Sequence, residues 1–290
     1  MLDVTRAYGL TFLFPEGDTA IGASLRNHGE FARPEVDLIG AHLDLFEEPG
    51  TFIDVGANIG SISLPLAATR SRWSVIAIEA HRGLSNVLAA NALNNQLYNV
   101  EVMCAVAGAT SGITSFPSVP LSARMNFGAL GSHLNDKVRP ERVLMWSLDE
   151  IAPPNTRFIK MDVEGAEIEV LKGAGKLIDE IRPIWLLEAN RSDGNREHEE
   201  RARETMRVLL NSAYKLFWFF APFTTGNASK APMTRSTPLR GDMNFLALPE
   251  TIGNVWNLPG IADLNAPWPQ QLAEFGYMTQ YGFQVSPSSA

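Results

Sequence analysis

The sequence predicts an α/β fold in which a mainly parallel sheet carries helices on both faces. Two observations indicate this class. From about residue 50 onward, short β-branched apolar runs alternate with apolar residues at helical spacing, the pattern of strand–helix–strand units with right-handed crossovers. The 290 residues are also 45% hydrophobic and only 19% charged, which supplies enough apolar material for a large packed core.

The expected elements follow one another through the middle of the chain. Strands are predicted at residues 51–55, 74–78, 100–106, 157–161 and 184–188, with closing strands at 216–220 and 244–248. Helical spacing covers residues 59–66, 84–94, 168–181 and 202–213. Pro65 makes the first of these helices short or kinked, and Pro183 follows the third.

The chain divides into an N-terminal extension, a core and a C-terminal extension. Residues 1–50 predict a hairpin and one helix near 34–46, residues 51–249 form the core, and residues 107–157 interrupt it as an insertion of loops and short strands, one of them at 142–146. Residues 250–290 hold six aromatic side chains: Trp256, Trp268, Phe275, Tyr277, Tyr281 and Phe283. Their exposure would create a large apolar patch, so we expect this segment to pack on the core or against a second subunit of a homodimer.

Composition and charge exclude several kinds of protein. The chain has 24 Lys and Arg against 32 Asp and Glu, a net charge of −8, so no nucleic-acid partner is expected. Cys104 is the only cysteine, which rules out an intramolecular disulfide and a cysteine-based zinc site. The sequence shows no signal peptide and no apolar run of the ~18 residues that a bilayer span needs. We expect a cytoplasmic protein without a membrane partner.

Glycines and acidic residues gather where four predicted strands end. These segments are Asp54–Gly60, Glu79, Asp162–Glu167 and Glu188–Asn190. In a parallel sheet the carboxyl ends of the strands share one edge, where ligands bind. Each segment alone has an ordinary interpretation, because glycines serve turns, Glu79 can favour a helix N-terminus and Asp162 can cap the next helix. Their common position favours a ligand site.

The first of these loops favours S-adenosylmethionine over a dinucleotide. Gly56 and Gly60 form a G-x-x-x-G spacing rather than the G-x-G-x-x-G of dinucleotide folds. S-adenosylmethionine has a ribose without a phosphate, and its cationic groups suit a pocket that contains Asp54, Glu79 and Asp162. The alternatives are a nicotinamide-dependent oxidoreductase that uses the same crevice and a non-catalytic protein that binds S-adenosylmethionine.

Two segments resemble a known family. Residues 51–60, TFIDVGANIG, resemble the first motif of class I S-adenosylmethionine-dependent methyltransferases, and residues 158–173, FIKMDVEGAEIEVLKG, resemble the signature of the FkbM family. The resemblance spans about residues 25–250. It implies a Rossmann-like, seven-stranded sheet with the last strand antiparallel, and methylation of a hydroxyl group on a small-molecule secondary metabolite or sugar.

The resemblance also implies roles for individual residues. Asp54, Gly56, Asn58 and Gly60 match the loop that holds the amino-acid end of the cofactor. Glu79 matches the acid that binds the ribose, and Ala80, His81 and Val106 are the expected adenine contacts, although family members often have proline after the glutamate. Asp162 matches the strand-end acid beside the transferable methyl group.

A hydroxyl acceptor must lose its proton near the transition state. Asp162 is the first candidate for the base or for orienting the hydroxyl, and His133 is the second because it lies in the insertion that should roof the site. Glu164 could join Asp162 in binding a divalent ion, but no third ligand is evident, so no metal is expected. Loops that face the substrate vary on one fold, so the sequence does not name the acceptor.

Overall fold

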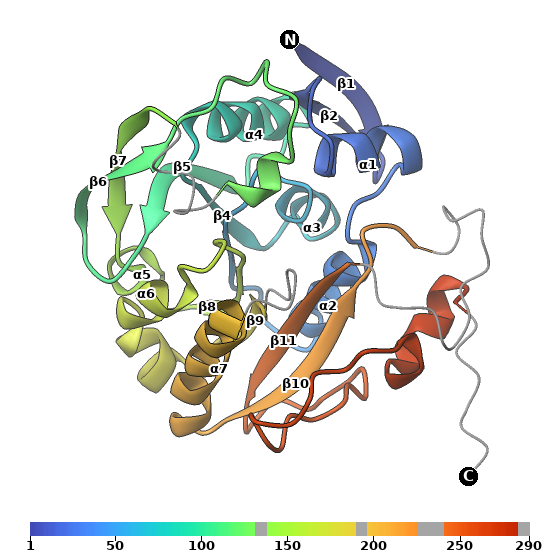
Figure 1. Ribbon diagram of the computed structural model, residues 1–290, viewed down its shortest axis with the longest axis vertical. Coiled ribbons are helices and arrows are strands. Elements are labelled where there is room, and N and C mark those ends of the chain that lie inside the picture. The colour runs from blue at the N-terminus through green and yellow to red at the C-terminus, as the bar shows by residue number, and fades with distance from the viewer. Residues whose placement is uncertain (131–137, 190–195, 226–240, 284–290) are drawn as a thin grey trace.

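A nine-stranded sheet with helices on both faces forms the centre of the molecule (Figure 1). The computed structural model describes residues 1–130, 138–189, 196–225 and 241–283. The strands of the sheet are β3 (Thr51–Val55), β4 (Ser74–Glu79), β5 (Val100–Ala107), β6 (Gly112–Pro117), β7 (Pro140–Trp146), β8 (Thr156–Met161), β9 (Ile184–Glu188), β10 (Tyr214–Ala221) and β11 (Asp242–Pro249). The helices are α1 (Ile21–His28), α2 (Arg33–Leu43), α3 (Ser63–Thr69), α4 (Arg82–Asn94), α5 (Leu148–Ile151), α6 (Glu167–Lys172) and α7 (Arg196–Asn211), with short turns η1 (Phe127–Ala129), η3 (Leu177–Ile181), η4 (Leu272–Glu274) and η5 (Gly276–Tyr281).

The predicted fold class is confirmed, but the sheet has nine strands rather than seven. The order is β10-β11-β9-β8-β3-β4-β5-β7-β6. The seven strands from β10 to β5 are those expected, and β11 runs antiparallel to both of its neighbours. The two additional strands come from the insertion, because β7 pairs in parallel with β5 and β6 pairs antiparallel with β7. The insertion therefore extends the sheet at one edge.

The single helix predicted over residues 168–181 is wrong, because two short helices occupy this stretch. α6 ends at Lys172 and η3 begins at Leu177. A Cβ atom on Gly173 would lie 2.2 Å from the carbonyl oxygen of Gly108, so the chain passes too close to a loop for an ordinary residue. The Asp149 carboxylate accepts hydrogen bonds from the amides of Lys176 and Leu177, at 2.9 and 3.0 Å, and so supports the start of η3.

Alternation along the strands divides the core into two layers. Phe52, Phe158 and Leu186 pack on the face that carries α2 and α3. The neighbouring residues Ile53, Ile159 and Trp185 pack on the opposite face, where α6 and α7 lie. Because strand side chains alternate with period two, residues 54, 160 and 188 lie on the α2 face. This face therefore carries three charged residues, Asp54, Lys160 and Glu188.

The C-terminal segment covers the open edge of β10. The amide of Trp218 donates to the carbonyl of Pro259 at 2.8 Å, and the amide of Ile261 donates to the carbonyl of Leu216 at 2.9 Å. The Tyr277 hydroxyl donates to the carbonyl of Phe220 at 2.6 Å and accepts from its amide at 2.9 Å. An uncovered edge strand would offer these groups to other chains, so the segment both satisfies and hides them.

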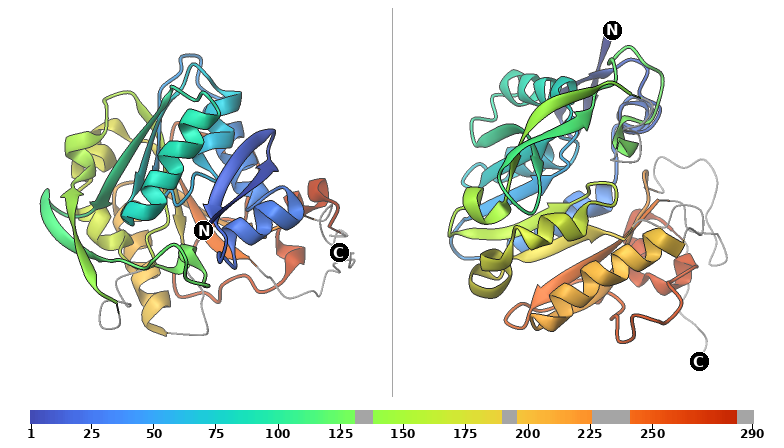
Figure 2. Two further views of the ribbon diagram at one scale, coloured as in Figure 1. Left: turned by 90° about the horizontal axis from the view of Figure 1, so that it is seen from above. Right: turned by 60° about the vertical axis from the view of Figure 1, so that its left-hand side comes forward.

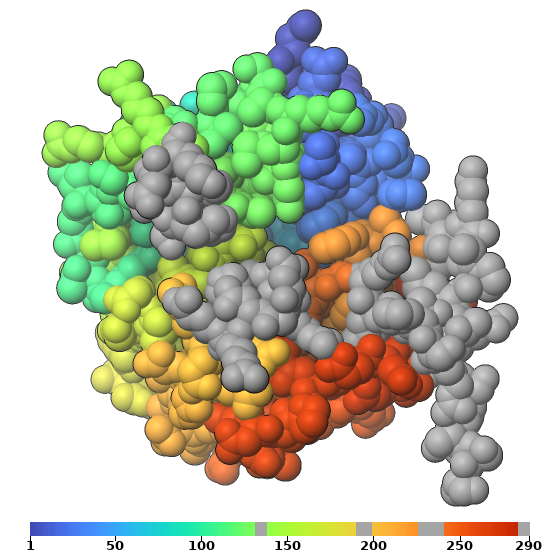
Figure 3. All heavy atoms as spheres, in the orientation of Figure 1, coloured from blue at the N-terminus to red at the C-terminus, as the bar shows by residue number. Residues whose placement is uncertain are grey.

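The N-terminal strands β1 (Leu2–Ala7) and β2 (Leu10–Pro15) form a separate hairpin. Tyr8 and Gly9 connect them, and both have positive φ values, 54° and 78°, as a two-residue hairpin turn requires. The hairpin lies beside α4 (Figure 2), where Asn91 and Asn95 bond the backbone of Leu13 and Thr11. The insertion packs against the N-terminal segment (green against blue in Figure 3). The amide of Thr19 donates to the carbonyl of Met125 at 2.9 Å, and the amide of Met125 donates to the carbonyl of Gly17 at 3.1 Å.

None of the helices in the described ranges combines the length and the hydropathy needed to cross a bilayer.

Candidate active site

A cavity of about 280 Å³ opens where β3, β4, β5 and β8 end. Six of the residues predicted to bind a cofactor line it: Gly56, Asn58, Glu79, Ala80, Val106 and Asp162. The insertion supplies a further wall through residues 114–117 of β6 and through Phe127, Gly128 and Leu130. His133 lies outside the described residues. The structure thus brings the ends of four strands and part of the insertion around one space.

The loop after β3 can form only because position 56 is glycine. Gly56 has a φ of 84°, and a Cβ atom there would lie 1.9 Å from the carbonyl oxygen of Asp162. The amides of Gly56 and Ala57 both donate to the carbonyl of Ile78, and the amide of Asp162 donates to the carbonyl of Val55. The loops after β3 and β8 are therefore in close backbone contact at the floor of the cavity.

Asn58 and Glu79 connect the loop after β3 to the end of β4. The amide of Asn58 donates to Glu79 Oε2 at 2.9 Å, and the amide of His81 donates to Glu79 Oε1 at 2.7 Å. Glu79 is only 7% exposed, and this burial raises its pKa to about 7 despite the two hydrogen bonds. Its carboxylate is held rigidly at the cavity, with lone pairs left for hydroxyl groups of a ligand.

Asp54 and Gly60 support the loop from behind and do not line the cavity. Asp54 is 1% exposed and accepts a hydrogen bond from the Ser63 hydroxyl at the start of α3. Its Oδ1 atom is buried without a hydrogen-bond partner among the described residues. Gly60 has a φ of 89° and packs against Leu64 and Leu88. Both residues stabilise the shape of the loop, and neither of them lines the cavity where a ligand would bind.

His81 holds the insertion in place instead of facing a ligand. It is the N-cap of α4, where its Nδ1 atom accepts from the amide of Leu84 at 3.2 Å. Its Nε2 atom lies 2.9 Å from the carbonyl oxygen of Val119 in the insertion. His81, two residues after Glu79, therefore connects the insertion to the start of α4.

The loop after β8 turns tightly and presents Asp162. Glu164 and Gly165 have φ values of 52° and 91°, and the amide of Ala166 returns to the carbonyl of Val163 at 3.3 Å. The capping interpretation of Asp162 is wrong, because the N-cap of α6 is Ala166, without a side-chain bond. Asp162 Oδ2 instead lies 3.2 Å from the ammonium nitrogen of Lys160.

Glu188 places a third carboxylate beside Asp162 and Glu164, although the sequence analysis found no third ligand for a metal ion. One oxygen of each of Asp162, Glu164 and Glu188 lies within 4.8 Å of the others. Burial, and then Asp162, Asp242 and Glu164, raise the pKa of Glu188 well above its usual range. A cation could bridge such oxygens, but the Lys160 ammonium already compensates Asp162, and we assign no metal.

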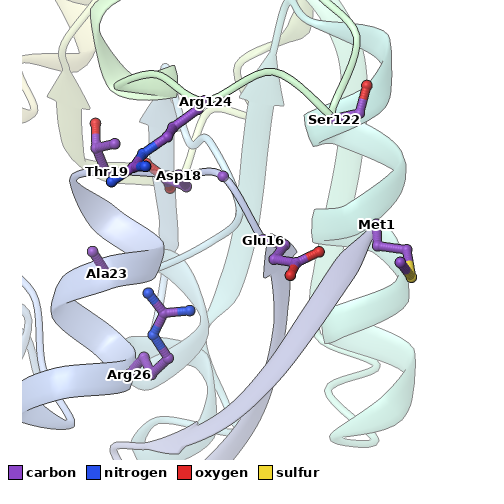
Figure 4. Close-up of a pocket in the computed structure, with 9 residues that line it drawn as sticks. Met1, Glu16, Asp18, Thr19, Ala23, Arg26, Ser122 and Arg124 are labelled. Atoms are coloured by element: carbon purple, nitrogen blue, oxygen red, sulfur yellow. The ribbon is translucent and has the colours of Figure 1, made fainter.

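A separate hollow lies at the N-terminal corner, between α1, β2 and residues 122–124 (Figure 4). Asp18 there accepts from the amides of Ala20 and Gly22, at 3.0 and 2.8 Å, and thereby satisfies the start of α1. Arg26 is bound to Asp3 at 3.0 Å. Asp18 and Arg26 are thus engaged within the protein, and the strand-end cavity remains the candidate site.

The family model of the methyltransferase FkbM domain matches residues 54–216, more than half of the chain. The chain belongs to the FkbM methyltransferase family. This range contains both glycine-containing loops, Glu79 and Asp162, so the family suggested by the two motifs is confirmed. No protein with a curated description matches the sequence.

Solved structures with similarity to this FkbM-family chain include other methyltransferases. The FkbM methyltransferase from Methylobacillus flagellatus KT is 20% identical with a TM-score of 0.43, and the match covers 69% of this chain and 43% of that protein. The O-methyltransferase TomG from Streptomyces achromogenes, in complex with S-adenosylmethionine, is 13% identical over 75% of this chain and 78% of its own, with a TM-score of 0.44. The O-methyltransferase from Bacillus cereus, in complex with S-adenosylhomocysteine, is 12% identical over 82% and 84%, with a TM-score of 0.44.

Proposed function

We propose that this chain transfers the methyl group of S-adenosylmethionine to a hydroxyl group of a small-molecule acceptor. Glu79 carries this proposal. Two backbone amides fix its carboxylate at the cavity, at the end of β4. A ribose offers two neighbouring hydroxyl donors to such a carboxylate, and charge-assisted hydrogen bonds of this kind are strong.

The remaining residues fit the other parts of the cofactor. Gly56 and Asn58 line the cavity beside Glu79 and would hold the amino-acid end, supported from behind by Asp54 and Gly60. Ala80 and Val106 line the part of the cavity that would receive the adenine. When bound, S-adenosylmethionine supplies an electrophilic methyl group on a cationic sulfur, which suits the acidic surroundings.

Asp162 is the proposed base. It lines the cavity at the end of β8, and its side chain is bound to Lys160 rather than to the helix that follows. As the acceptor oxygen forms its bond to the methyl carbon, Asp162 takes the hydroxyl proton and the carbon–sulfur bond breaks, leaving S-adenosylhomocysteine. Alignment in a closed site supplies much of the rate, up to ~7–11 kcal/mol in favourable cases.

Equilibrium dialysis against labelled S-adenosylmethionine and, separately, NADH tests the cofactor. A screen of metabolite hydroxyl acceptors with labelled S-adenosylmethionine then tests transfer. We expect Asp162→Asn to keep cofactor binding and lower turnover by roughly 10²-fold, a typical general-base effect. The exposed Asp179→Asn variant is the matched control. Binding of NADH alone would favour an oxidoreductase, and cofactor binding without transfer to any acceptor would indicate a non-catalytic protein.

A further inference from the structure

A row of charged and polar side chains crosses the α2 face of the sheet next to the cavity. Asp54, Lys160 and Glu188 each stand two residues beyond an apolar side chain packed on that face, namely Phe52, Phe158 and Leu186. Asn244 continues the row on β11, opposite Glu188 in the strand register. Glu35 reaches the row from α2, where Asn244 Nδ2 donates to its Oε1 atom at 3.4 Å. Four strands and one helix therefore contribute to this row.

Lys160 is the cation of this row. It is 5% exposed, lies opposite Asp54 in the register of β3 and β8, and donates to Asp162 Oδ2 at 3.2 Å. Burial alone would lower the pKa of Lys160, but Asp162, Glu35 and Asp54 together raise it above its usual range. The ammonium group therefore remains charged, and the carboxylates around it hold it in place.

Five other carboxyl groups surround Asp162 and Lys160. Glu188 and Asp242 face Asp162 from β9 and β11, Glu164 follows it in the loop, and Glu35 and Asp54 face Lys160 from α2 and β3. In these acidic surroundings the Lys160 ammonium donates to Asp162, the carboxylate at the end of β8 that lines the cavity.

We propose that Lys160 is a positioning residue, whose ammonium group holds one oxygen of Asp162 so that the other faces the acceptor's hydroxyl group. This inference rests on the proposed function, in which Asp162 is the base. The Lys160 side chain of this ion pair is only 6% exposed, whereas the Asp162 side chain is 36% exposed and remains open to the cavity. The salt bridge of Lys172 with Glu169, in which both side chains are more than half exposed, provides a control.

Carbon-13 NMR of the full chain, labelled at the aspartate side-chain carboxyl carbons, follows the surroundings of the Asp162 carboxyl group without any ligand. Its signal is assigned as the one that Asp162→Asn removes. We expect Lys160→Met to shift this signal at neutral pH, because the carboxyl group loses its ammonium partner. Lys160→Arg should restore much of the original position, and Lys172→Met should leave the signal unchanged. An unchanged signal in Lys160→Met would contradict the proposal.

A second measurement covers the case in which Lys160→Met does not fold. In protein labelled with lysine side-chain nitrogen-15, the Lys160 ammonium signal should move in Asp162→Asn and stay in place in Asp179→Asn. A Lys160 ammonium signal that does not move in Asp162→Asn would contradict the positioning role. Calorimetry with S-adenosylmethionine on the unmodified chain tests the proposed function separately, so either the function or the role of Lys160 can fail alone.

Discussion

The carbonyl oxygen of Asp162 occupies the space that a side chain at position 56 would need. A Cβ atom on Gly56 would lie only 1.9 Å from it. The base candidate and the cofactor loop are therefore in backbone contact, through residues that are 106 positions apart in the chain (162 − 56). Any side chain at position 56 must push the two loops apart.

We expect Gly56→Ala to lower the free energy of unfolding by more than ~2 kcal/mol. A left-handed backbone costs an ordinary residue ~1–2 kcal/mol, and the overlap with Asp162 adds to this cost. Urea unfolding measures the effect, and calorimetry should show at least tenfold weaker binding of S-adenosylmethionine. Gly253→Ala is the control, because a Cβ atom there meets nothing within 4 Å. Normal stability and binding in Gly56→Ala would mean that the loops do not approach as closely as described.

Binding of S-adenosylmethionine should strengthen as the pH rises through about 7. Burial raises the pKa of Glu79 to about 7, so the carboxyl group is protonated below this pH and ionised above it. The ionised form is the better acceptor for two ribose hydroxyls. Calorimetry between about pH 6 and pH 8 should show this gain, whereas Glu79→Gln should lose the step and bind at least tenfold more weakly at the higher pH, a loss of about 1.4 kcal/mol or more. Glu101→Gln, an exposed change on the neighbouring strand, should behave like the unmodified chain. A pH step that survives in Glu79→Gln would assign it to another group.

The Tyr277 hydroxyl should contribute to stability through the edge of β10. Tyr277→Phe removes both of its hydrogen bonds to Phe220 and leaves a backbone amide and a carbonyl without partners. Unsatisfied groups of this kind cost about 1–3 kcal/mol. Urea unfolding should show a loss of that size, and Tyr98→Phe should show none because Tyr98 is 82% exposed. Equal stability of the two variants would show that water replaces the hydroxyl at this edge.

His42 should make the fold sensitive to acid. Its ring is fully buried, with Nδ1 at 2.8 Å from the carbonyl oxygen of Leu38, and burial lowers its pKa. Since the folded pKa lies below the unfolded value of about 6.5, the unfolded state takes up a proton first and stability falls as the pH drops below that value. We expect the stability of the unmodified chain relative to His42→Phe to decline from about pH 7 to pH 5. His28→Gln, at an exposed position, should not change the pH profile, and parallel profiles for His42→Phe and the unmodified chain would exclude His42 as the cause.

Local sequence patterns were sufficient to predict the central strands of the sheet and the strand-end residues around the cavity. The apolar runs predicted the central strands, and the shared edge of a parallel sheet correctly brought Gly56, Glu79 and Asp162 around one cavity. The patterns failed where residues distant in sequence decide the local structure. The helix predicted over residues 168–181 is split because the backbone at Gly173 passes close to Gly108. The strands β6 and β7 extend the sheet because β7, from the insertion, pairs with β5.

The sequence by itself determined which residues end the strands, because strand and helix periods are local and the carboxyl ends of parallel strands must meet. Only the tertiary structure decided the electrostatic surroundings of Asp162, since Glu35, Asp54, Lys160 and Glu188 come from four separate elements. One signal was present, namely a lysine inside the apolar run Phe158–Met161, because a buried ammonium needs anionic partners. The identity of those partners depends on long-range packing, which no local periodicity encodes.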